Sequence, residues 1–424
     1  MNKIIILLTI IIILIDLYSY KGIAVTFPKL MAGNKIFLLI YFGISAFFIV
    51  ALLRVSRFNF FERKPEIFAG FYLLAGVFLL IYLPKLIFIA FHLCEDIFHL
   101  IAKAITVVVN LADSDHRHLT RMHFLSVTGL IIAIIPFFAL LYGMTLGRFN
   151  YRVEKTRLEF PELPAGFNGL KIVHISDLHL GSLYNKKEKL ARAVDIINNQ
   201  NPDLILFTGD LVNNFSEEAV GWEKLFDQLN ARYGKYSVLG NHDYGDYWHW
   251  ANEEEQHANM DLLADLYKRM GFRLLLNEAV TITNKDDSIV ILGVENWGKP
   301  PFRQSGDLKK ALSSVNGTSF KILLSHDPSH WKAEVTDSTS IQLTLSGHTH
   351  AGQFGLRLNG YSWSPSKYLY KQWNGLYRDD QQYLYVNRGL GYIGFPGRVG
   401  MAPEISVLEL YRTAAQDANQ LQPE

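Results

Sequence analysis

Four long apolar segments occupy the first third of this 424-residue chain and limit how that part can fold. They cover about residues 4–20, 36–53, 67–91 and 124–146. Each approaches the ~20 residues that a helix needs to cross a bilayer. Lipid offers backbone groups no hydrogen bonds, so segments of this kind are expected to be helical. We therefore predict an all-α bundle of about four transmembrane helices within residues 1–150, with the lipid bilayer as its partner.

Two of these segments have a second interpretation. The first has Lys3 ahead of an apolar core, as a signal peptide does. It lacks a small-x-small cleavage site and further spans follow it, so we expect a retained anchor. The third contains Pro84, where we expect the helix to kink or end, with residues 97–111 forming an amphipathic helix at the membrane surface.

Basic residues in the short loops indicate the orientation of the spans. Three lysines lie between the first two segments: Lys21, Lys29 and Lys35. More basic residues lie before the third segment and after the fourth: Arg54, Arg57, Arg63, Lys64, Arg148, Arg152, Lys155 and Arg157. Because the more basic side is usually cytoplasmic, we expect both termini and the domain at 151–424 on the cytoplasmic side.

The composition excludes some classes of site. The one cysteine, Cys94, excludes an internal disulfide framework and a zinc site made of cysteines. The formal net charge is +1, and residues 171–410 have no basic stretches beside aromatic side chains. Both features argue against nucleic acid as a partner.

Beyond residue 150, short apolar runs alternate with helical periodicity. Residues 158–169 contain two prolines and two glycines and are predicted to form a linker. The predicted strands are 171–176, 203–208, 236–239, 272–277, 279–284, 288–294, 320–325, 341–346, 382–387 and 405–410. The predicted helices are 186–199, 216–231, 252–270 and 306–314. This order predicts an α/β domain at 151–424 with mixed rather than purely parallel sheets.

Five short polar motifs directly follow predicted strands. They are Asp177-Leu178-His179, Gly209-Asp210, Gly240-Asn241-His242-Asp243, His326 within Ser325-His326-Asp327, and Gly347-His348-Thr349-His350. Ligands in open α/β sheets gather beyond the carboxyl ends of strands, so we expect these side chains to meet. Asp, Asn and His without a thiolate suit two hard or borderline divalent cations. Such a pair can clamp the attacking and the leaving oxygen of a phosphoester displacement.

Two local features support this interpretation. Asp177 and His179 are two residues apart, so an extended backbone would place both side chains on one face. Glycine precedes Asp210, Asn241 and His348, which would let the backbone approach closely at each motif.

In order, the five motifs resemble the D-x-H, G-D, G-N-H-D/E, H and G-H-x-H blocks of the calcineurin-like metallophosphoesterase superfamily, over about residues 171–410. The resemblance implies a four-layer sandwich of two mixed sheets flanked by helices. It implies one metal ion held by Asp177, His179, Asp210 and His350, and a second held by Asp210, Asn241, His326 and His348.

The same resemblance implies roles for three further residues. His242 matches the family's catalytic histidine, which stabilises or protonates the leaving group, and Asp243 would orient it. Asn213 departs from the pattern, since many members have aspartate there. That position generally contacts a metal ligand rather than the metal, so we expect metal binding to be intact and proton transfer to be altered.

A narrower resemblance concerns the substrate. Gly347-His348-Thr349-His350-Ala351-Gly352-Gln353, Asn387-Arg388-Gly389-Leu390-Gly391 and Pro403-Glu404-Ile405 are together similar to a bacterial branch with amino-terminal membrane helices. Some of that branch, and related enzymes, cleave the pyrophosphate of UDP-2,3-diacylglucosamine in lipid A synthesis. The likeness implies a multi-pass protein of the bacterial inner membrane.

Two groups of side chains are candidates for contact with the substrate. Arg388 and Arg398 are predicted to bind a substrate phosphate, with surface pairing to an acid as the alternative. Aromatic residues follow the third and fifth motifs: Tyr244, Tyr247, Trp248, Trp250, Tyr361, Trp363, Tyr368, Tyr370, Trp373 and Tyr377. They form either an apolar cradle at the headgroup layer or ordinary loop packing.

The leading hypothesis is a membrane-anchored, two-metal phosphodiesterase or pyrophosphatase acting on a lipid-linked phosphoester. Manganese is the first choice of metal, with iron, zinc or magnesium open, because nitrogen and oxygen ligands discriminate poorly among them. One alternative is a nuclease or cyclic-nucleotide phosphodiesterase. Another is a non-catalytic metal-binding module on a membrane transporter or receptor, against which the intact ligand set and His242 argue.

Overall fold

The architecture comes from a computed structural model in which residues 3–55, 63–112, 123–315, 317, 319–358 and 360–413 are described. Arg57, used above for the orientation, lies outside these residues. The chain divides into two compact units. The helical unit is Met1–Glu62 with Leu74–Tyr142, and the sheet unit is Arg63–Leu73 with Gly143–Glu424.

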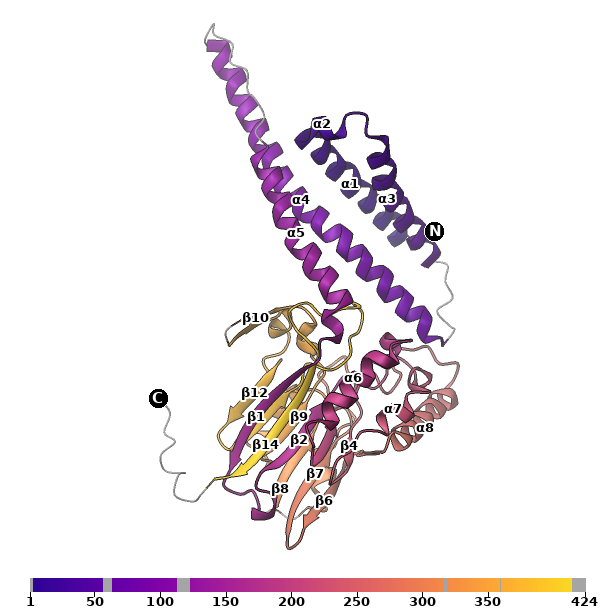
Figure 1. The fold of residues 1–424 in the computed structure, drawn as a ribbon, viewed down its shortest axis with the longest axis vertical. Coiled ribbons are helices and arrows are strands. Elements are labelled where there is room, and N and C mark those ends of the chain that lie inside the picture. The colour runs from indigo at the N-terminus through magenta and orange to yellow at the C-terminus, as the bar shows by residue number, and fades with distance from the viewer. Residues whose placement is uncertain are drawn as a thin grey trace. The chain divides into compact units, whose positions relative to one another are not determined.

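The expected membrane helices are present (Figure 1). The helices before the sheets are α1 (Lys3–Thr26), α2 (Pro28–Met31), α3 (Lys35–Val55), α4 (Pro65–Ala112) and α5 (Phe124–Thr145). All except α2 are long and apolar enough to cross a membrane, which confirms four candidate spans. The expected end of the helix at Pro84 is wrong, because α4 is one helix of 48 residues that contains this proline and residues 97–111. A kink at Pro84 remains a prediction. Membrane helices tolerate proline where neighbouring groups satisfy the freed carbonyl.

A partly buried ion pair links two helices inside the helical unit. Nζ of Lys85 on α4 lies 2.6 Å from Oδ1 of Asp16 on α1. The hydroxyl of Tyr82 donates to Oδ2 of Asp16 at 2.8 Å. Charged groups within membrane helices need such partners, because an unpaired charge in lipid is costly. The pair therefore fixes α1 against α4.

Two six-stranded mixed sheets form the centre of the sheet unit (Figure 1). The first has the order β1 (Arg152–Phe160), β14 (Glu404–Arg412), β2 (Leu170–Ile175), β3 (Leu204–Phe207), β4 (Lys235–Ser237) and β5 (Phe272–Leu274). The second has the order β12 (Gly375–Asp379), β13 (Gln382–Val386), β9 (Leu343–Ser346), β8 (Phe320–Leu324), β7 (Asp287–Gly293) and β6 (Glu278–Asn284). β2 to β5 run parallel, as do β7, β8, β9 and β13.

Alternate side chains of each strand enter different apolar layers. Ile172 of β2 and Ile322 of β8 pack in the cluster between the two sheets. Val173 points to the opposite face of the first sheet, which α6 (Lys187–Asn198), α7 (Glu223–Phe226) and α8 (Glu253–Arg269) cover. Leu323 points to the outer face of the second sheet, covered by α9 (Leu308–Leu312) and the π-helical turn η5 (Trp331–Val335). Helices, sheet, sheet and helices form the expected four layers.

Two of the predicted segments in the sheet unit are assigned wrongly. Residues 158–160, predicted to be in a linker, end β1, where Leu158 and Phe160 are buried. Charged residues concealed this strand, and edge strands commonly carry them. The predicted helix at 216–231 is instead two short helices, η4 (Ser216–Ala219) and α7, because Gly221 adopts a φ of 83° between them.

The first turns of α4 pack within the sheet unit. The ring of Phe68 lies edge-on to Phe215 and to Trp248, with centroids 5.9 Å apart in each pair. Arg63 pairs with Glu255 at 3.0 Å. In the sequence, the spans α4 and α5 lie between residues 63–73 and the rest of the sheet unit. Two crossings return the chain to the side where it started, so both parts of the sheet unit must lie on the same side of a membrane. The observed contacts meet that requirement.

Candidate metal centre

The polar motifs meet at one edge of the two sheets. Asp177, Asp210 and Asn241 lie in the loops after β2, β3 and β4, and His326 and His348 lie in the loops after β8 and β9. Neighbouring strands in each set are parallel, so their carboxyl ends lie together. This is the edge at which the strand pattern predicts a ligand site.

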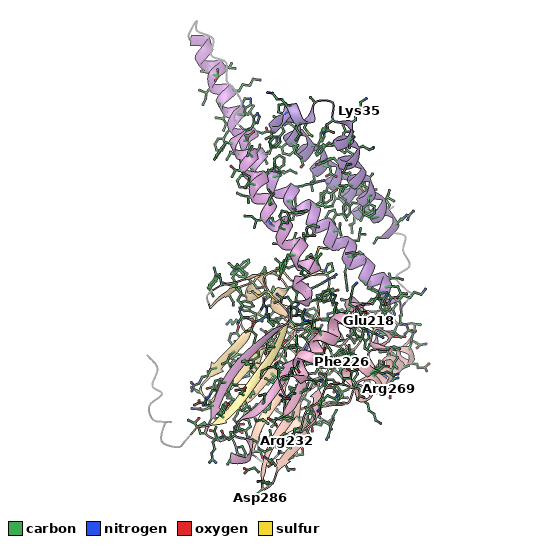
Figure 2. All side chains as sticks on the ribbon, viewed as in Figure 1. Lys35, Glu218, Phe226, Arg232, Arg269 and Asp286 are labelled. Atoms are coloured by element: carbon green, nitrogen blue, oxygen red, sulfur yellow. The ribbon has the colours of Figure 1, made fainter. Side chains whose placement is uncertain are left out.

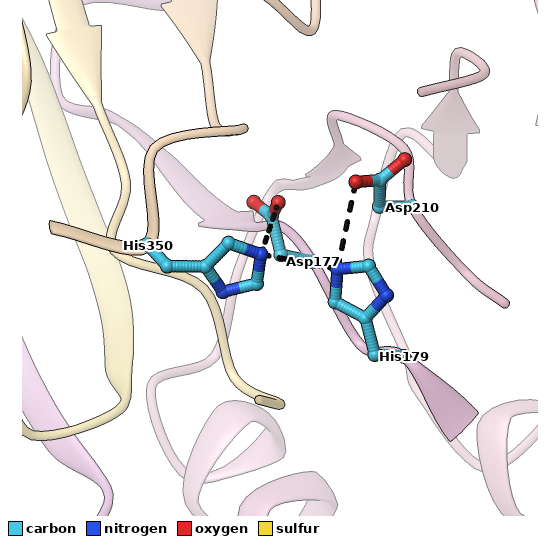
Figure 3. A group of neighbouring side chains, drawn as sticks. All are labelled: Asp177, His179, Asp210 and His350. Carbon is cyan, nitrogen blue, oxygen red and sulfur yellow. Dashed lines mark hydrogen bonds and ion pairs between the residues drawn. The ribbon is translucent and has the colours of Figure 1, made fainter. Parts of the chain in front are cut away.

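Four side chains form a first group: Asp177, His179, Asp210 and His350 (Figure 3). Their ligand atoms all lie within 4.8 Å of one another. Nε2 of His350 is 3.2 Å from Oδ1 of Asp177, and Nε2 of His179 is 3.5 Å from Oδ2 of Asp210. The two Nε2 atoms are 3.0 Å apart. Residues separated by more than 170 positions in the chain thus converge on one point.

Asp210 also belongs to a second group, with His326 and His348. Nε2 of His326 lies 3.2 Å from Oδ2 of Asp210 and 3.2 Å from the amide oxygen of Asn241. Both ligand sets that the resemblance implies are therefore brought together, with Asp210 in each.

The ligand loops have an unusual backbone conformation. Asp177, His179, Asp210, His348 and His350 all have φ between 47° and 69°, in the left-handed region. The expectation of extended backbone at Asp177 and His179 is therefore wrong. Non-glycine residues pay a conformational cost there, and such residues gather at functional sites. The sharp turns redirect these side chains toward the common centre.

Fixed partners hold the imidazole rings from outside the two groups. Nδ1 of His179 lies 3.1 Å from the side-chain oxygen of Asn213. Nδ1 of His326 donates to the carbonyl of Thr208 at 2.6 Å. These contacts leave each Nε2 facing the centre, the usual arrangement for a metal-binding histidine. Asn213 thus has the supporting position that the resemblance implies.

Burial and neighbouring charges set the protonation of the site. Burial raises the pKa of Asp177 to about 7. Burial would also raise the pKa of Asp210, but His326 and His242 hold it well below its usual value. Burial opposes a charge on His326, yet Asp210 and Asp177 raise the pKa of His326 to about 10. A carboxylate charge at Asp210 is therefore favoured.

The donor set fits divalent cations. Burial lowers the pKa of His179 to about 3 and that of His350 well below its usual value, so both rings are neutral. Each neutral ring offers one nitrogen lone pair, and the two Nε2 atoms converge beside the Asp177 and Asp210 carboxylates. Imidazole nitrogens and carboxylate oxygens are ligands that Mn, Fe and Zn accept.

His242 lies beside the first group. Its ring is edge-on to His179, with centroids 5.0 Å apart. Nδ1 donates to the carbonyl of Asn213 at 2.6 Å, and the backbone N–H donates to Oδ1 of Asp210 at 2.9 Å. The ring is thus fixed through Nδ1, which leaves Nε2 as the nitrogen able to meet a substrate.

Asp243 does not orient this ring by a hydrogen bond between the two described side chains, contrary to expectation. Its carboxylate accepts hydrogen bonds from the backbone N–H groups of Asp210 at 2.9 Å, Leu211 at 2.8 Å and Gly240 at 2.9 Å. The Asp243 carboxylate thus satisfies buried backbone N–H groups in two of the loops that carry candidate ligands. Asp243 therefore positions the loops that carry Asp210 and Asn241.

Arg388 and Arg398 make their hydrogen bonds inside the protein. Arg388 pairs with Glu404 and Glu154, each at 3.0 Å. Arg398 donates to the carbonyl of Arg388 at 2.7 Å and lies 3.3 Å from Nδ1 of His350. Both side chains are buried, so these contacts favour a positioning role. Binding of a substrate phosphate by either remains a prediction.

Tyr370 is among the aromatic candidates from the sequence, but the sequence does not single it out as a residue at the centre. The hydroxyl of Tyr370 is 2.7 Å from Nε2 of His348. Tyr370 lies 22 positions after His348 in a loop rich in aromatic residues, and no spacing rule distinguishes it from its neighbours. Only the folded loop shows the contact.

Replacing Gly347 by alanine is expected to disturb the centre without removing a ligand. A Cβ at this position would collide with Oγ of Ser176 and Oδ2 of Asp177. Displacement by about 1 Å can cost about 10²-fold in rate, so we expect a loss of that order and weaker metal binding. Gly317→Ala is the control, because a Cβ there meets no atom within 4 Å. Normal metal content and turnover in Gly347→Ala would contradict this packing.

Comparisons with known proteins agree with this geometry. The family model described as "Probable Calcineurin-like phosphoesterase, transmembrane domain" matches residues 2–148. The model described as "Calcineurin-like phosphoesterase" matches residues 170–352, which include every residue of the two ligand groups.

Individual relatives match one or both parts of the chain. An uncharacterized metallophosphoesterase of Bacillus subtilis, YkuE, is 35% identical over 59% of this chain and 82% of its own length. An uncharacterized metallophosphoesterase of Campylobacter jejuni is 26% identical over 94% of this chain and 95% of its own. A transmembrane protein with metallophosphoesterase domain from Danio rerio is 30% identical over 63% of this chain, and the match spans 59% of that relative's length.

Proposed function

This chain belongs to the calcineurin-like metallophosphoesterases, and from that membership we propose that it hydrolyses a phosphodiester or pyrophosphate bond of a lipid-linked substrate. The protein is a membrane-associated metallophosphoesterase. The observation that carries the proposal is the sharing of Asp210 between two ligand groups. Oδ2 of Asp210 lies 3.5 Å from Nε2 of His179 and 3.2 Å from Nε2 of His326, so this one side chain faces both groups and can serve two cations side by side.

The proposed metal ligands are those of the two groups together with Asn241. When bound, two divalent cations would supply Lewis acidity that neutralises charge developing on the phosphoryl oxygens. Manganese is our first choice, with iron, zinc and magnesium as alternatives.

His242 is the proposed catalytic residue among the chain's own groups. The hydrogen bond from its Nδ1 to the carbonyl of Asn213 holds the ring in one orientation. Its Nε2, when protonated, would donate that proton to the leaving oxygen as general acid. Asp243 supports this indirectly, by holding the loops of Asp210 and Asn241 through their backbone N–H groups.

Membrane residence supports a lipid-linked substrate. Four candidate spans precede β1, and the carbonyl of Gly143, near the end of α5, accepts a hydrogen bond from the N–H of Arg398 at 3.1 Å. We propose residues 1–150 as the membrane domain, residues 151–424 as the catalytic domain, and UDP-2,3-diacylglucosamine as the first compound to test. The proposed location is the bacterial inner membrane, with the catalytic domain in the cytoplasm.

A panel of phosphoesters tests this function on purified full-length protein with added manganese. It includes UDP-2,3-diacylglucosamine, a nitrophenyl diester, a phosphomonoester, a cyclic nucleotide and single-stranded DNA. Preference for the lipid-linked compound supports the proposal. Preference for the cyclic nucleotide or DNA would favour the phosphodiesterase or nuclease alternative. Absence of turnover with metal bound would favour a non-catalytic module.

A further inference from the structure

We propose that an exposed apolar surface beside the metal centre, made of Leu356, Leu358, Tyr361, Tyr368 and Leu369, contacts the lipid bilayer and guides acyl chains of the substrate toward His348. We call these five residues the contact surface. Their side chains are 55–80% exposed. The guiding of acyl chains rests on the proposed function, whereas contact with the bilayer does not.

The hairpin that carries three of these residues has one apolar face. β10 (Leu356–Leu358) and β11 (Tyr361–Trp363) form a two-stranded sheet that, among the described residues, pairs with no other strand. Leu356 lies opposite Trp363, and Leu358 lies opposite Tyr361. Residues directly opposite, and alternate residues of a strand, share a face. These four side chains therefore lie on the same face, and a lone hairpin is only marginally stable in water without cover.

The polar face of the hairpin is tied to the body of the sheet unit. Arg357, between Leu356 and Leu358, points to the opposite face and forms an ion pair with Glu154 of β1. Glu154 also pairs with the buried Arg388 at 3.0 Å. Because this face is held by the protein, the apolar face with Leu356 and Leu358 points outward.

Backbone contacts place the hairpin close to the end of a membrane span. The N–H of Arg398 donates to the carbonyl of Gly143 in the last turn of α5, at 3.1 Å. The next residue, Val399, accepts a hydrogen bond from the N–H of Gly355 at 2.9 Å. Gly355 directly precedes β10. A membrane-spanning helix such as α5 ends at a bilayer surface. The two hydrogen bonds, Arg398 to Gly143 and Gly355 to Val399, therefore place the start of the hairpin near that surface.

The segment after the hairpin leads to the metal centre. Tyr368 and Leu369 are the most exposed residues of the contact surface, and the hydroxyl of the next residue, Tyr370, lies 2.7 Å from Nε2 of His348. The hydroxyl of Ser364 donates to the carbonyl of Ala351 at 2.6 Å, which ties this segment to the loop of His350. Tyr370 thus lies between the exposed side chain of Leu369 and the proposed metal ligand His348.

The chemistry of this surface matches a bilayer interface. Tyrosine is enriched at the headgroup level, where its ring is in apolar surroundings and its hydroxyl is hydrated. Lys367 and Lys371 flank Tyr368 and Leu369 and are exposed, so they would face anionic headgroups. In the other aromatic group, Tyr244 is buried and Trp248 packs against Phe215. Tyr247 is exposed, but its hydroxyl accepts a hydrogen bond from the side-chain amide of Asn241 at 2.8 Å, beside the metal centre.

Contact with lipid can be measured at Leu369 in the full-length protein. Cys94 is replaced by serine, Leu369→Cys is labelled with an environment-sensitive fluorophore, and the protein is placed in nanodiscs with or without nitroxide-labelled phosphatidylcholine. Interfacial segments insert about 5–10 Å, so we expect the nitroxide to remove about half or more of the fluorescence. The same label at Asp286→Cys is the control.

Asp286 is suited to this purpose by its position. It is exposed in the β6–β7 turn, and Figures 1 and 2 show that turn at the opposite end of the sheet unit from β10. Equal quenching at both positions, or none at Leu369→Cys, would overturn contact with lipid. A signal at Leu369→Cys that changes with protein concentration and not with the nitroxide would assign the surface to a second copy of the chain.

Guiding of acyl chains has a separate test. The double substitution Leu358→Ser with Leu369→Ser is expected to lower turnover of UDP-2,3-diacylglucosamine in vesicles about tenfold or more, because weaker interfacial binding presents less substrate. Turnover of a soluble nitrophenyl diester should not change. Leu276→Ser, an apolar residue 40% exposed outside the contact surface, is the control. Equal losses on both substrates would overturn the guiding role. If the wild-type protein does not turn over UDP-2,3-diacylglucosamine, this compound is not the substrate. The quenching experiment then still decides whether the contact surface meets lipid.

Discussion

Replacing Asp210 by alanine is expected to abolish hydrolysis and to lower bound metal from two ions toward none. Its carboxylate belongs to both ligand groups, so no complete ligand set remains. Oδ1 also accepts the backbone N–H of His242 at 2.9 Å, so this proposed catalytic residue would lose a support as well. Metal analysis of the purified protein and turnover of a nitrophenyl diester measure the two effects.

The matched comparison is His326→Ala, which alters only the second group. This variant should keep the ion of the first group and lose the other, with a large loss of turnover. Asp286→Ala removes an exposed carboxylate, and this variant should bind metal and hydrolyse the diester as the wild type does. An Asp210→Ala protein with two ions and near-normal turnover would refute the assignment of the site.

Replacing His242 by alanine is expected to keep both metal ions but to lower the rate at least ~10²-fold on substrates with poor leaving groups, the range of a general acid. His242 is in neither ligand group, so metal content should not change. An activated nitrophenyl diester should suffer less, because its leaving group needs little protonation. Rates on a series of diesters with leaving groups of different pKa measure the effect.

How the rate loss depends on the pKa of the leaving group distinguishes proton donation by His242 from stabilisation of charge in the transition state. A loss that grows with leaving-group pKa supports proton donation through Nε2. Equal losses across the series would show that the ring acts on charge in the transition state instead. Loss of metal in His242→Ala would show that the ring supports His179, whose ring lies edge-on to it with centroids 5.0 Å apart.

Much of the fold could be predicted because many strands and helices have clear patterns of apolar residues in the sequence. The buried strands β2 and β8 are continuous apolar runs, and α8 has a clear helical pattern with Asn252 capping its first turn. β1 escaped prediction because its charged residues hide the alternation, and its partner β14 is at the far end of the chain. Such long-range pairing leaves no local signal.

The convergence of the candidate ligands could be predicted because their loops follow strands, whereas the contacts that support them could not. The hydrogen bonds from the N–H groups of Asp210 and Leu211 to Asp243 join two loops whose residues are 32–33 positions apart. Arg398 reaches His350 across 48 residues. A pattern of residue types shows neither contact, because both arise from loop conformations set by left-handed backbone at the ligands.

The central claim is that one Asp210 carboxylate serves two cations that act together. The most direct test is titration of metal-stripped full-length protein with Mn²⁺, with bound metal and diester hydrolysis followed in the same samples. The expected result is two ions per chain at saturation, with most turnover appearing as the second ion binds, because both ligand groups are needed. Full turnover with a single bound ion, or two bound ions without turnover of any phosphoester, would contradict it.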